Sequence, residues 1–445
     1  MPVRLWKHDS KGTTVWQATL NGKTLTTTVG KPYSDQKPSK KSFKTLPAAK
    51  QGLAQLVAEK REAGFRGLGE IDPPSIPIAR DAALEAEIRK HRDDPQGYLV
   101  YADWLQGRGC ELGELIAYAH RKKPKQALAI AKKIGLPPEN MATAGWRFGL
   151  WQWLKLDNQV DSMPPADDKF DPVAFARALF TSPLCAALEE LRIGMLRWEY
   201  QDQPDVVAEA GKQAWAKDLV RLRVGDVGDD IDMDHHTVGD IGKAITKAFP
   251  NLESLWLHSG SQEWSGPRTF EIGGLDLPKL RELTIETCAM SRKRMKALTA
   301  GKLPAIEHLE LWFGDQRESA TATTADVAPV WDGKLFPRLR HLGLRNTELV
   351  LDIARLLPES KLAKQLVSLD LSKGTFGDAE AAALAEGAAS FSSLTTLVVD
   401  DSWLTKTGIG VLKKAFPRAK VSAKNQQELL DPEEYGRDRF VSVSE

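Results

Sequence analysis

The stretch "LPKLRELTIETC", residues 277–288, decides how the second half of this chain is expected to fold. "FPNLESLWLHSG" and "FPRLRHLGLRNT" repeat its spacing upstream and downstream. The pattern L-x-x-L-x-L recurs with its middle residue at intervals of 26 to 33 residues, at Leu191, Leu222, Leu255, Leu283, Leu309, Leu342, Leu369 and Leu397. Scattered leucines would not keep such a spacing, so we interpret the pattern as one structural unit copied along the chain.

Each copy predicts one short strand followed by a helix. Between strands, apolar residues recur at helical spacing, as in Val238, Ile241, Ile245 and Phe249, or Ala381, Leu384, Ala388 and Phe391. One strand and one helix cannot bury their own apolar face, so the units must stack. The expected fold class is α/β: a leucine-rich-repeat solenoid with parallel strands on its concave face and helices outside. Where the repeats usually carry Asn or Cys after the strand, only Cys288 conforms, so we expect an irregular array.

Residues 1–65 predict a small α+β domain. "TTVWQATLNGKTLTTTVG" places β-forming residues on both sides of Asn21-Gly22, which favours a type I′ hairpin. A helix should follow and end at Gly64, with an apolar face of Ala49, Leu53, Leu56 and Val57. This order resembles the WGR domain of poly(ADP-ribose) polymerases and some bacterial proteins, through Trp16, Gly22, Gly30, Phe43, the "AAKQGLAQLVAEK" helix and Gly64-Phe65. In those polymerases the Trp and Arg of the name-giving triplet help to grip DNA ends, whereas the triplet here is Val29-Gly30-Lys31.

Charge is unevenly distributed along the chain. Residues 1–65 hold 12 basic and 4 acidic side chains, a net +8, so the remaining residues sum to −7 in a chain of +1. This excess predicts an acidic partner, and nucleic acid is the alternative function that it supports. Trp6 or Tyr33 would stack on bases, and the phosphate contacts would come from Lys31, Lys37, Lys40, Lys41 and Lys44. A lysine-rich surface that only keeps the protein in solution is the competing interpretation.

A Gly- and Pro-rich linker is expected at residues 66–80, followed by a helical domain at 81–165. There Asp94 and Pro95 predict a helix start, Gly107 and Gly109 predict its end, and Leu99 and Val100 are expected on its apolar faces. The stretch "LVYADWLQGRGCELGELI" resembles the bacterial repeat-companion domain, which usually precedes repeats. The resemblance implies the repeat array at 166–424. Residues 425–445 would form a cap, through Leu429 and Leu430, or an acidic peptide motif.

The candidate site is the set of variable strand residues that point away from the buried leucines. Aromatic rings beside charges are typical of protein interfaces, and terminal segments that fold over these side chains are the alternative. The expected partner-binding residues are Arg192, Arg221, Arg223, Trp256, His258, Glu282, Glu286, His308, Glu310, Trp312, His341 and Arg345.

No catalytic, cofactor or metal site is expected from the motifs. Residues 225–240, "GDVGDDIDMDHHTVGD", fail as an EF-hand because His235 and Ile241 stand where Gly and Glu are needed. An acidic loop is the preferred interpretation, and a loose transition-metal site the alternative. Three scattered cysteines and the lack of a long apolar run favour a cytoplasmic protein with no membrane contact. We therefore expect a non-catalytic scaffold that binds a protein partner on the concave face of its repeats.

Overall fold

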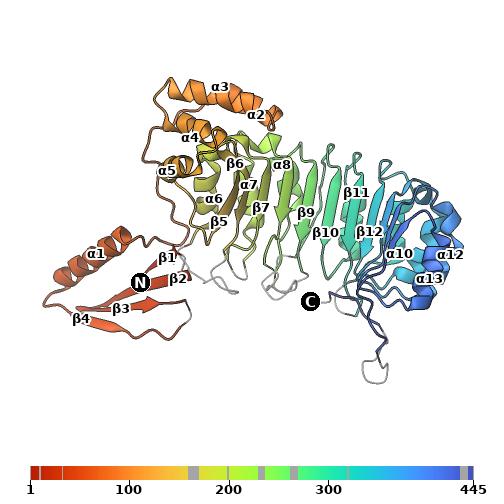
Figure 1. The fold of residues 1–445 in the computed structure, drawn as a ribbon. Helices are drawn as coiled ribbons and strands as arrows, with labels where there is room; N and C mark the ends of the chain where they lie inside the picture. The colour runs from red at the N-terminus through yellow and green to blue at the C-terminus, as the bar shows by residue number, and fades with distance from the viewer. Residues whose placement is uncertain are drawn as a thin grey trace. The chain divides into compact units, whose positions relative to one another are not determined.

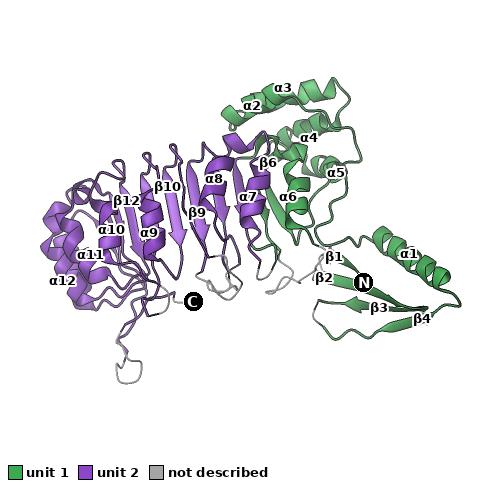
Figure 2. Cartoon of the chain, turned by 180° about the vertical axis from the view of Figure 1, so that it is seen from behind, with its two compact units in different colours: residues 1–188, 195–198 green, residues 189–194, 199–445 purple. Residues whose placement is uncertain are grey.

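The computed structural model describes residues 2–9, 12–32, 34–158, 170–197, 200–228, 236–260, 269–317, 320–430 and 439–443. The chain divides into two compact units, residues 1–188 with 195–198 and residues 189–194 with 199–445 (Figure 2). Each unit combines strands with helices, and the second contains most of a large, mainly parallel sheet. The domain boundaries expected at 65, 80, 165 and 424 stay predictions.

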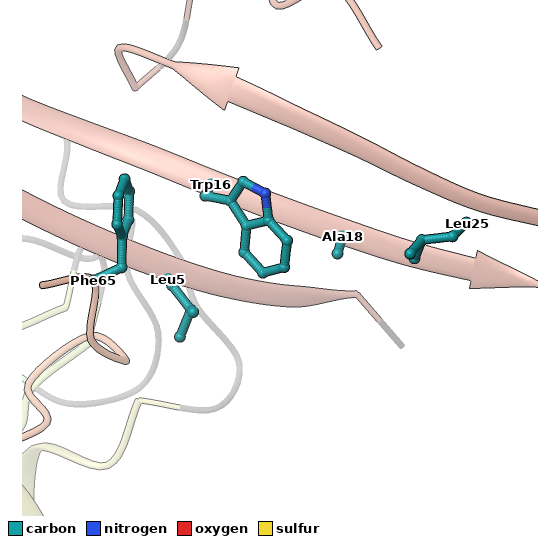
Figure 3. Packing of buried hydrophobic residues seen from close by; sticks show 5 residues of the cluster. All are labelled: Leu5, Trp16, Ala18, Leu25 and Phe65. Atoms are coloured by element: carbon teal, nitrogen blue, oxygen red, sulfur yellow. The ribbon is translucent and has the colours of Figure 1, made fainter. Parts of the chain in front are cut away.

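The first unit begins with an antiparallel sheet in the order β1-β2-β3-β4, followed by α1. Their bounds are β1 Val3–Asp9, β2 Gly12–Asn21, β3 Thr24–Gly30, β4 Ser39–Ser42 and α1 Leu46–Glu62. The core holds Leu5, Trp16, Ala18, Leu25 and Phe65 (Figure 3). Phe43, Leu53, Leu56 and Val57 pack against it, which confirms the apolar face expected for this helix.

The hairpin between β2 and β3 forms, but its turn differs from the prediction. Asn21 pairs with Thr24, so the two turn residues are Gly22 and Lys23 rather than Asn21 and Gly22. Gly22 has a φ of +58°, and Lys23 is not among the residues with positive φ. A type I′ turn needs positive φ at both positions, so that assignment was wrong.

The rest of the first unit is mainly helical. Its elements are α2 Ala82–Lys90, α3 Pro95–Gln106, α4 Glu111–His120, α5 Pro124–Ile134, β5 Ala142–Arg147, β6 Leu150–Leu156, α6 Pro172–Phe180 and the 3₁₀ turn η1 Pro183–Ala187. Asp94 caps α3 by accepting from the Gln96 N–H, as expected. The predicted face of α3 was wrong, because Val100 is 55% exposed and the helix instead buries Tyr98, Tyr101, Ala102 and Leu105.

In the second unit, nine strands lie side by side in chain order and each neighbouring pair is parallel. They are β7 Glu190–Ile193, β8 Arg221–Val224, β9 Ser254–His258, β10 Glu282–Glu286, β11 His308–Trp312, β12 His341–Arg345, β13 Ser368–Asp370, β14 Thr396–Val398 and β15 Lys420–Ser422. Each of the eight predicted middle leucines is the register partner of the next, from Leu191 to Leu397, and Val421 continues the row. The predicted registration is therefore confirmed.

Helices connect these strands and lie on one face of the sheet. They are α7 Gln203–Ala210, α8 Gly242–Ala248, α9 Arg292–Thr299, α10 Thr324–Trp331, α11 Val350–Leu356, α12 Asp378–Glu386 and α13 Lys406–Ala415. Short 3₁₀ turns occur at η2 Ala216–Asp218, η4 Leu357–Glu359, η5 Leu362–Gln365 and η6 Ala388–Ser390. Figure 2 shows α8, α9 and α10 in front of the strands, whereas Figure 1 shows β9 to β12 from the opposite side. We call that opposite side the strand face.

Leu429 and Leu430 do not provide the expected cap. Leu429 is 60% exposed and Leu430 is not fully buried, so neither seals the last strand–helix unit. Residues 439–443, the C-terminal segment, instead return along the loops that follow the strands, where Val441 is 1% exposed. Their hydrogen bonds reach residues as distant in sequence as Asn346.

Candidate functional site

Side chains alternate along each strand between the core and the strand face. In β9, Leu255 and Leu257 are buried, whereas Ser254, Trp256 and His258 are partly exposed. Among the predicted binding residues, Glu282 is exposed, Trp312 is buried and the others lie between these limits. The structure gathers the predicted residues into separate groups, two of which are built around a tryptophan.

The Trp256 cluster consists of Arg223, Trp256, His258 and Glu286. Arg223 and Trp256 are register partners on β8 and β9, and the guanidinium carbon lies 4.2 Å from the ring centroid. The indole N–H of Trp256 donates to Oε1 of Glu286 at 3.0 Å. The Trp256 and His258 rings stack with centroids 5.4 Å apart and an angle of 7° between their planes. The ring is thus held on three sides while part of it stays open to solvent.

Burial shifts the titration of the groups around Trp256. It raises the pKa of Glu286, and the hydrogen bond from Trp256 offsets only part of this shift. Burial also lowers the pKa of His258, although a hydrogen-bond contact with the Gly225 carbonyl acts against it. Beneath His258, the ring of His236 stacks at 6.2 Å, and burial lowers the pKa of His236 to about 3. Both imidazoles are therefore neutral at pH 7, which leaves Arg223 as the cation beside the ring.

The Trp312 cluster consists of Glu310, Trp312, Arg345 and Asp370. It repeats the same contacts: Trp312 and Arg345 are register partners, and the guanidinium carbon lies 4.8 Å from the ring centroid. The Trp312 N–H donates to Oε1 of Glu310 at 2.8 Å, and Arg345 donates to the same oxygen at 2.8 Å. Arg345 also lies 3.6 Å from Asp370, whose pKa is raised by burial.

Trp312 is not the exposed ring that its outward position predicts. It is only 8% exposed, and it packs with Cys288 and Ala289 beneath Val443 of the C-terminal segment. A terminal segment therefore packs against the cluster that contains this tryptophan, which agrees with the alternative interpretation of the sequence. Cys288 is buried, in keeping with a structural role.

The remaining predicted residues lie in two other groups. Arg192 and Arg221 both donate to Glu190, at 2.6 and 3.1 Å. Burial opposes ionisation of this carboxyl, but the two hydrogen bonds outweigh it and its pKa is lowered. At the first positions of their strands, Glu282 pairs in register with His308, and His308 with His341. The two imidazoles stack at 5.6 Å.

The five predicted nucleic-acid lysines, Lys31, Lys37, Lys40, Lys41 and Lys44, are all exposed, and two of them lie on the edge strand β4. Trp6 does not serve as a stacking platform, because it is 7% exposed and packs with Val15 and Leu68. Tyr33 lies outside the described residues.

The predicted acidic loop falls partly outside the described residues, which omit 229–235 and therefore His235. Within the described ranges, no group of three or more His, Cys, Asp or Glu side chains is arranged to hold a metal ion. Nor does any helix in those ranges have the length and apolarity to span a membrane.

Sequence reasoning missed one surface feature, a pocket of about 440 Å³ in the first unit. Its wall includes Leu128, Trp146 and Phe148, and the first two are 47% and 43% exposed. Phe148 has a φ of +49°, a conformation that no local pattern predicts for an aromatic residue. The pocket is mainly apolar, so it could recognise a ligand by its shape rather than through polar or charged groups.

Comparisons with known proteins give a likeness of fold only. No family model matches the chain, and no curated protein matches it. Among solved structures it is similar to the crystal structure of a protein from Bacteroides fragilis, determined as a structural-genomics target. The two share 16% identity with a TM-score of 0.51, and the alignment covers 100% of each chain. At this identity the likeness supports a mixed α/β fold with a large, mainly parallel sheet, and carries no function.

Proposed function

We propose that this chain is a leucine-rich-repeat protein that binds a protein partner on its strand face without turnover. The observation that carries the proposal is the Trp256 cluster, in which a partly exposed indole is fixed between charged and aromatic neighbours. Tryptophan and arginine are the residues most enriched at interface hot spots. The eight leucines in register support the repeat interpretation, with the strand face as the concave side of a solenoid.

The arrangement of the cluster favours binding because little order has to be created when a partner arrives. Glu286 and Arg223 already restrict the rotamer of Trp256, so its conformational entropy is largely lost before association. The arginine side chain is 39% exposed, which leaves a cation available to a partner carboxylate. A partner with an apolar contact flanked by acidic groups matches this surface. We place such a scaffold in the cytoplasm, as expected from its three buried free cysteines.

The test is affinity capture from cells of the source organism with the full chain as bait. We expect Trp256→Ala combined with Arg223→Glu to abolish capture of proteins that the wild type retains. Trp146→Ala is the matched control, since it removes an exposed tryptophan from the first unit. Equal capture by the double variant and the wild type, with unchanged circular dichroism, would contradict the proposal.

The second candidate function is nucleic-acid binding by the lysine-rich first 65 residues. Its support is the exposure of all five lysines that the sequence singled out. Fluorescence anisotropy of the full chain with labelled single-stranded and duplex oligonucleotides would test it. Binding that weakens steeply with salt, and is reduced by Lys40→Glu with Lys41→Glu, is expected from released counterions. No binding at low salt would end this candidate.

A further inference from the structure

The C-terminal segment, residues 439–443, contacts the loops that follow β12, β13 and β14, and we call the surface that it covers the groove. The segment is not a strand of the sheet, and its main chain is bound mainly by side chains and loop atoms. The Asn346 amide makes two hydrogen bonds to Val443: Nδ2 donates to its carbonyl at 2.6 Å and Oδ1 accepts from its N–H at 2.9 Å. The Ser442 N–H donates to the Lys373 carbonyl at 2.8 Å. These contacts bind main-chain atoms of the segment, so they do not depend on the identity of its side chains.

Side chains of the segment fill distinct positions along the groove. Nη1 of Arg439 donates to Oε2 of Glu380 and to the Thr375 carbonyl, each at 2.8 Å. A Cβ at Gly377 would lie 2.6 Å from that nitrogen, so the glycine leaves the guanidinium room to enter. The carboxylate side chain of Glu380 is only 5% exposed, which makes this a buried, charge-specific position.

The other positions are aromatic and aliphatic. Phe440 meets Trp403 edge to face, with ring centroids 5.3 Å apart, and the Trp403 indole N–H donates to the Phe440 carbonyl at 3.0 Å. Val441 is buried, and Val443 packs against the cluster of Cys288, Ala289 and Trp312. In order, the positions therefore hold Arg, an aromatic residue, an aliphatic residue, Ser442 and a second aliphatic residue.

The walls of the groove are held by bonds of their own. Glu380 also accepts from the Gly377 N–H at 2.8 Å, which caps α12. The backbone N–H of Trp403 donates to the Phe376 carbonyl, and the backbone N–H of Asn346 donates to the Ser372 carbonyl. Asn346 is fully buried with a φ of +51°, so its amide is fixed by a backbone conformation that asparagine tolerates. Removal of five residues that pair with no strand would leave these bonds in place.

We propose that this groove is a peptide-binding site for a partner protein that presents an Arg-aromatic-aliphatic-x-aliphatic segment, and that residues 439–443 occupy it as the chain's own competitor. The inference goes beyond the proposed function, since only Trp312 belongs both to the groove and to the predicted partner-binding residues. An attached competitor acts at an effective concentration on the order of millimolar, so a partner peptide must displace it. The wild type should accordingly bind such a peptide weakly.

The test uses the full chain and a fluorescent peptide, acetyl-Arg-Phe-Val-Ser-Val-amide, followed by anisotropy. Arg439→Glu with Val443→Asp releases the segment, and we expect this variant to bind the peptide about tenfold or more tightly than the wild type. Asn346→Gly, added to the release variant, keeps the left-handed backbone but removes the amide, and should cost about tenfold in affinity. A peptide with Glu in place of Arg is the specificity control. No binding to the release variant, or equal binding to both proteins, would overturn the proposal.

Hydrogen exchange of the wild type keeps the proposal open to refutation if the release variant fails to fold. The amides of Ser442 and Val443 should exchange about a hundredfold faster than those of β12 and β13, because the segment opens without global unfolding. Exchange as slow as in those strands would make it an integral part of the core and contradict its role as a competitor. Concentration-dependent dimers of the wild type that the release substitutions abolish would assign the groove to a second copy, and would also overturn the partner peptide. Loss of capture with Trp256→Ala but unchanged peptide binding would affect the strand-face proposal alone.

Discussion

Trp256 and Trp312 are built with the same contacts yet lie in different environments. Each donates its indole N–H to a glutamate, Glu286 or Glu310, and each has the arginine of an adjacent strand over its ring. Trp256 remains partly exposed, whereas Trp312 is 8% exposed beneath the C-terminal segment. The local motif therefore does not decide whether such a ring is available for binding. Whether another part of the chain packs over the ring decides its availability.

The two clusters therefore have different roles although they contain similar residue types. Around Trp312, Arg345 makes hydrogen bonds to Glu310 and Ser372 and lies near Asp370, so the charges are largely satisfied within the chain. Around Trp256, the nearest acidic oxygen to Arg223 belongs to Asp226 at 3.7 Å, a weaker and more exposed pair. The first cluster is suited to stability, and the second retains charge for a partner.

The largest expected effect is on stability, from removal of the buried ring. Trp312→Ala should lower the free energy of unfolding by about 3 to 5 kcal/mol, the usual range for a buried tryptophan in a core. Trp256→Ala should cost about 1 kcal/mol, because part of its ring is already in water. Denaturation in urea, followed by circular dichroism, measures both. Equal losses would show that burial does not distinguish the two clusters.

Substitution of the two arginines should reduce stability in the same order as substitution of the two tryptophans, with a smaller difference between the clusters. Arg345→Ala leaves Glu310 and Asp370 partly buried without their cation, at an expected cost of about 2 kcal/mol. Arg223→Ala should cost less than about 1 kcal/mol, since its pair with Asp226 is long and the arginine side chain is 39% exposed. The same unfolding experiment tests this order, and a larger loss for Arg223→Ala would contradict it.

Acid should weaken the protein through the histidines beside Trp256. The folded pKa of His236 is about 3 and its ordinary value is 6.5, so between these values only the unfolded chain binds the proton. Stability from this group is complete above pH 6.5 and falls by about 2 kcal/mol on going to pH 5. His236→Gln should remove that dependence. The raised pKa values of Glu286 and Asp370 act in the opposite sense, because those carboxyls hold protons more tightly when folded.

Unfolding at pH 7.5 and pH 5 in wild type and His236→Gln isolates the contribution of His236, since His258 and the carboxyls are common to both proteins. The same loss in the two proteins on acidification would show that His236 is not the responsible group.

The smallest expected effect concerns the cover over Trp312. Val443→Ala should cost about 1 kcal/mol, because it removes two partly buried methyl groups from the ring. Leu429→Ala is the matched control and should cost almost nothing, since that side chain is 60% exposed. Thermal melts that showed the reverse order would restore Leu429 as the cap that the sequence suggested.

Much of the second unit could be predicted from the sequence. The L-x-x-L-x-L spacing fixed the register of eight strands, because a period of two in a strand determines which side chains face the core. Aligning those leucines also places Arg223 opposite Trp256 and Arg345 opposite Trp312, as the structure has them. The two clusters follow from this register and from side-chain length.

Other local predictions failed where the signal was too short to decide between neighbours. The hairpin turn lies one residue later than predicted, because Gly22 accepts positive φ at the first turn position as readily as at the second. Val100 was placed on a buried face of α3, but Tyr98, Tyr101 and Leu105 fill that face and leave it in solvent.

By itself, the sequence determined the ladder of leucines and the chemical character of the face opposite to them, since both depend on alternation within a few residues. Only the tertiary structure decided that Val443 packs against the cluster of Trp312, Cys288 and Ala289, that Glu380 pairs with Arg439, and that Trp256 stays partly exposed. These contacts join residues far apart in the chain, where no periodicity relates one partner to the other. Burial at a given position is set by whichever segment returns to it, and that depends on the packing of the whole unit.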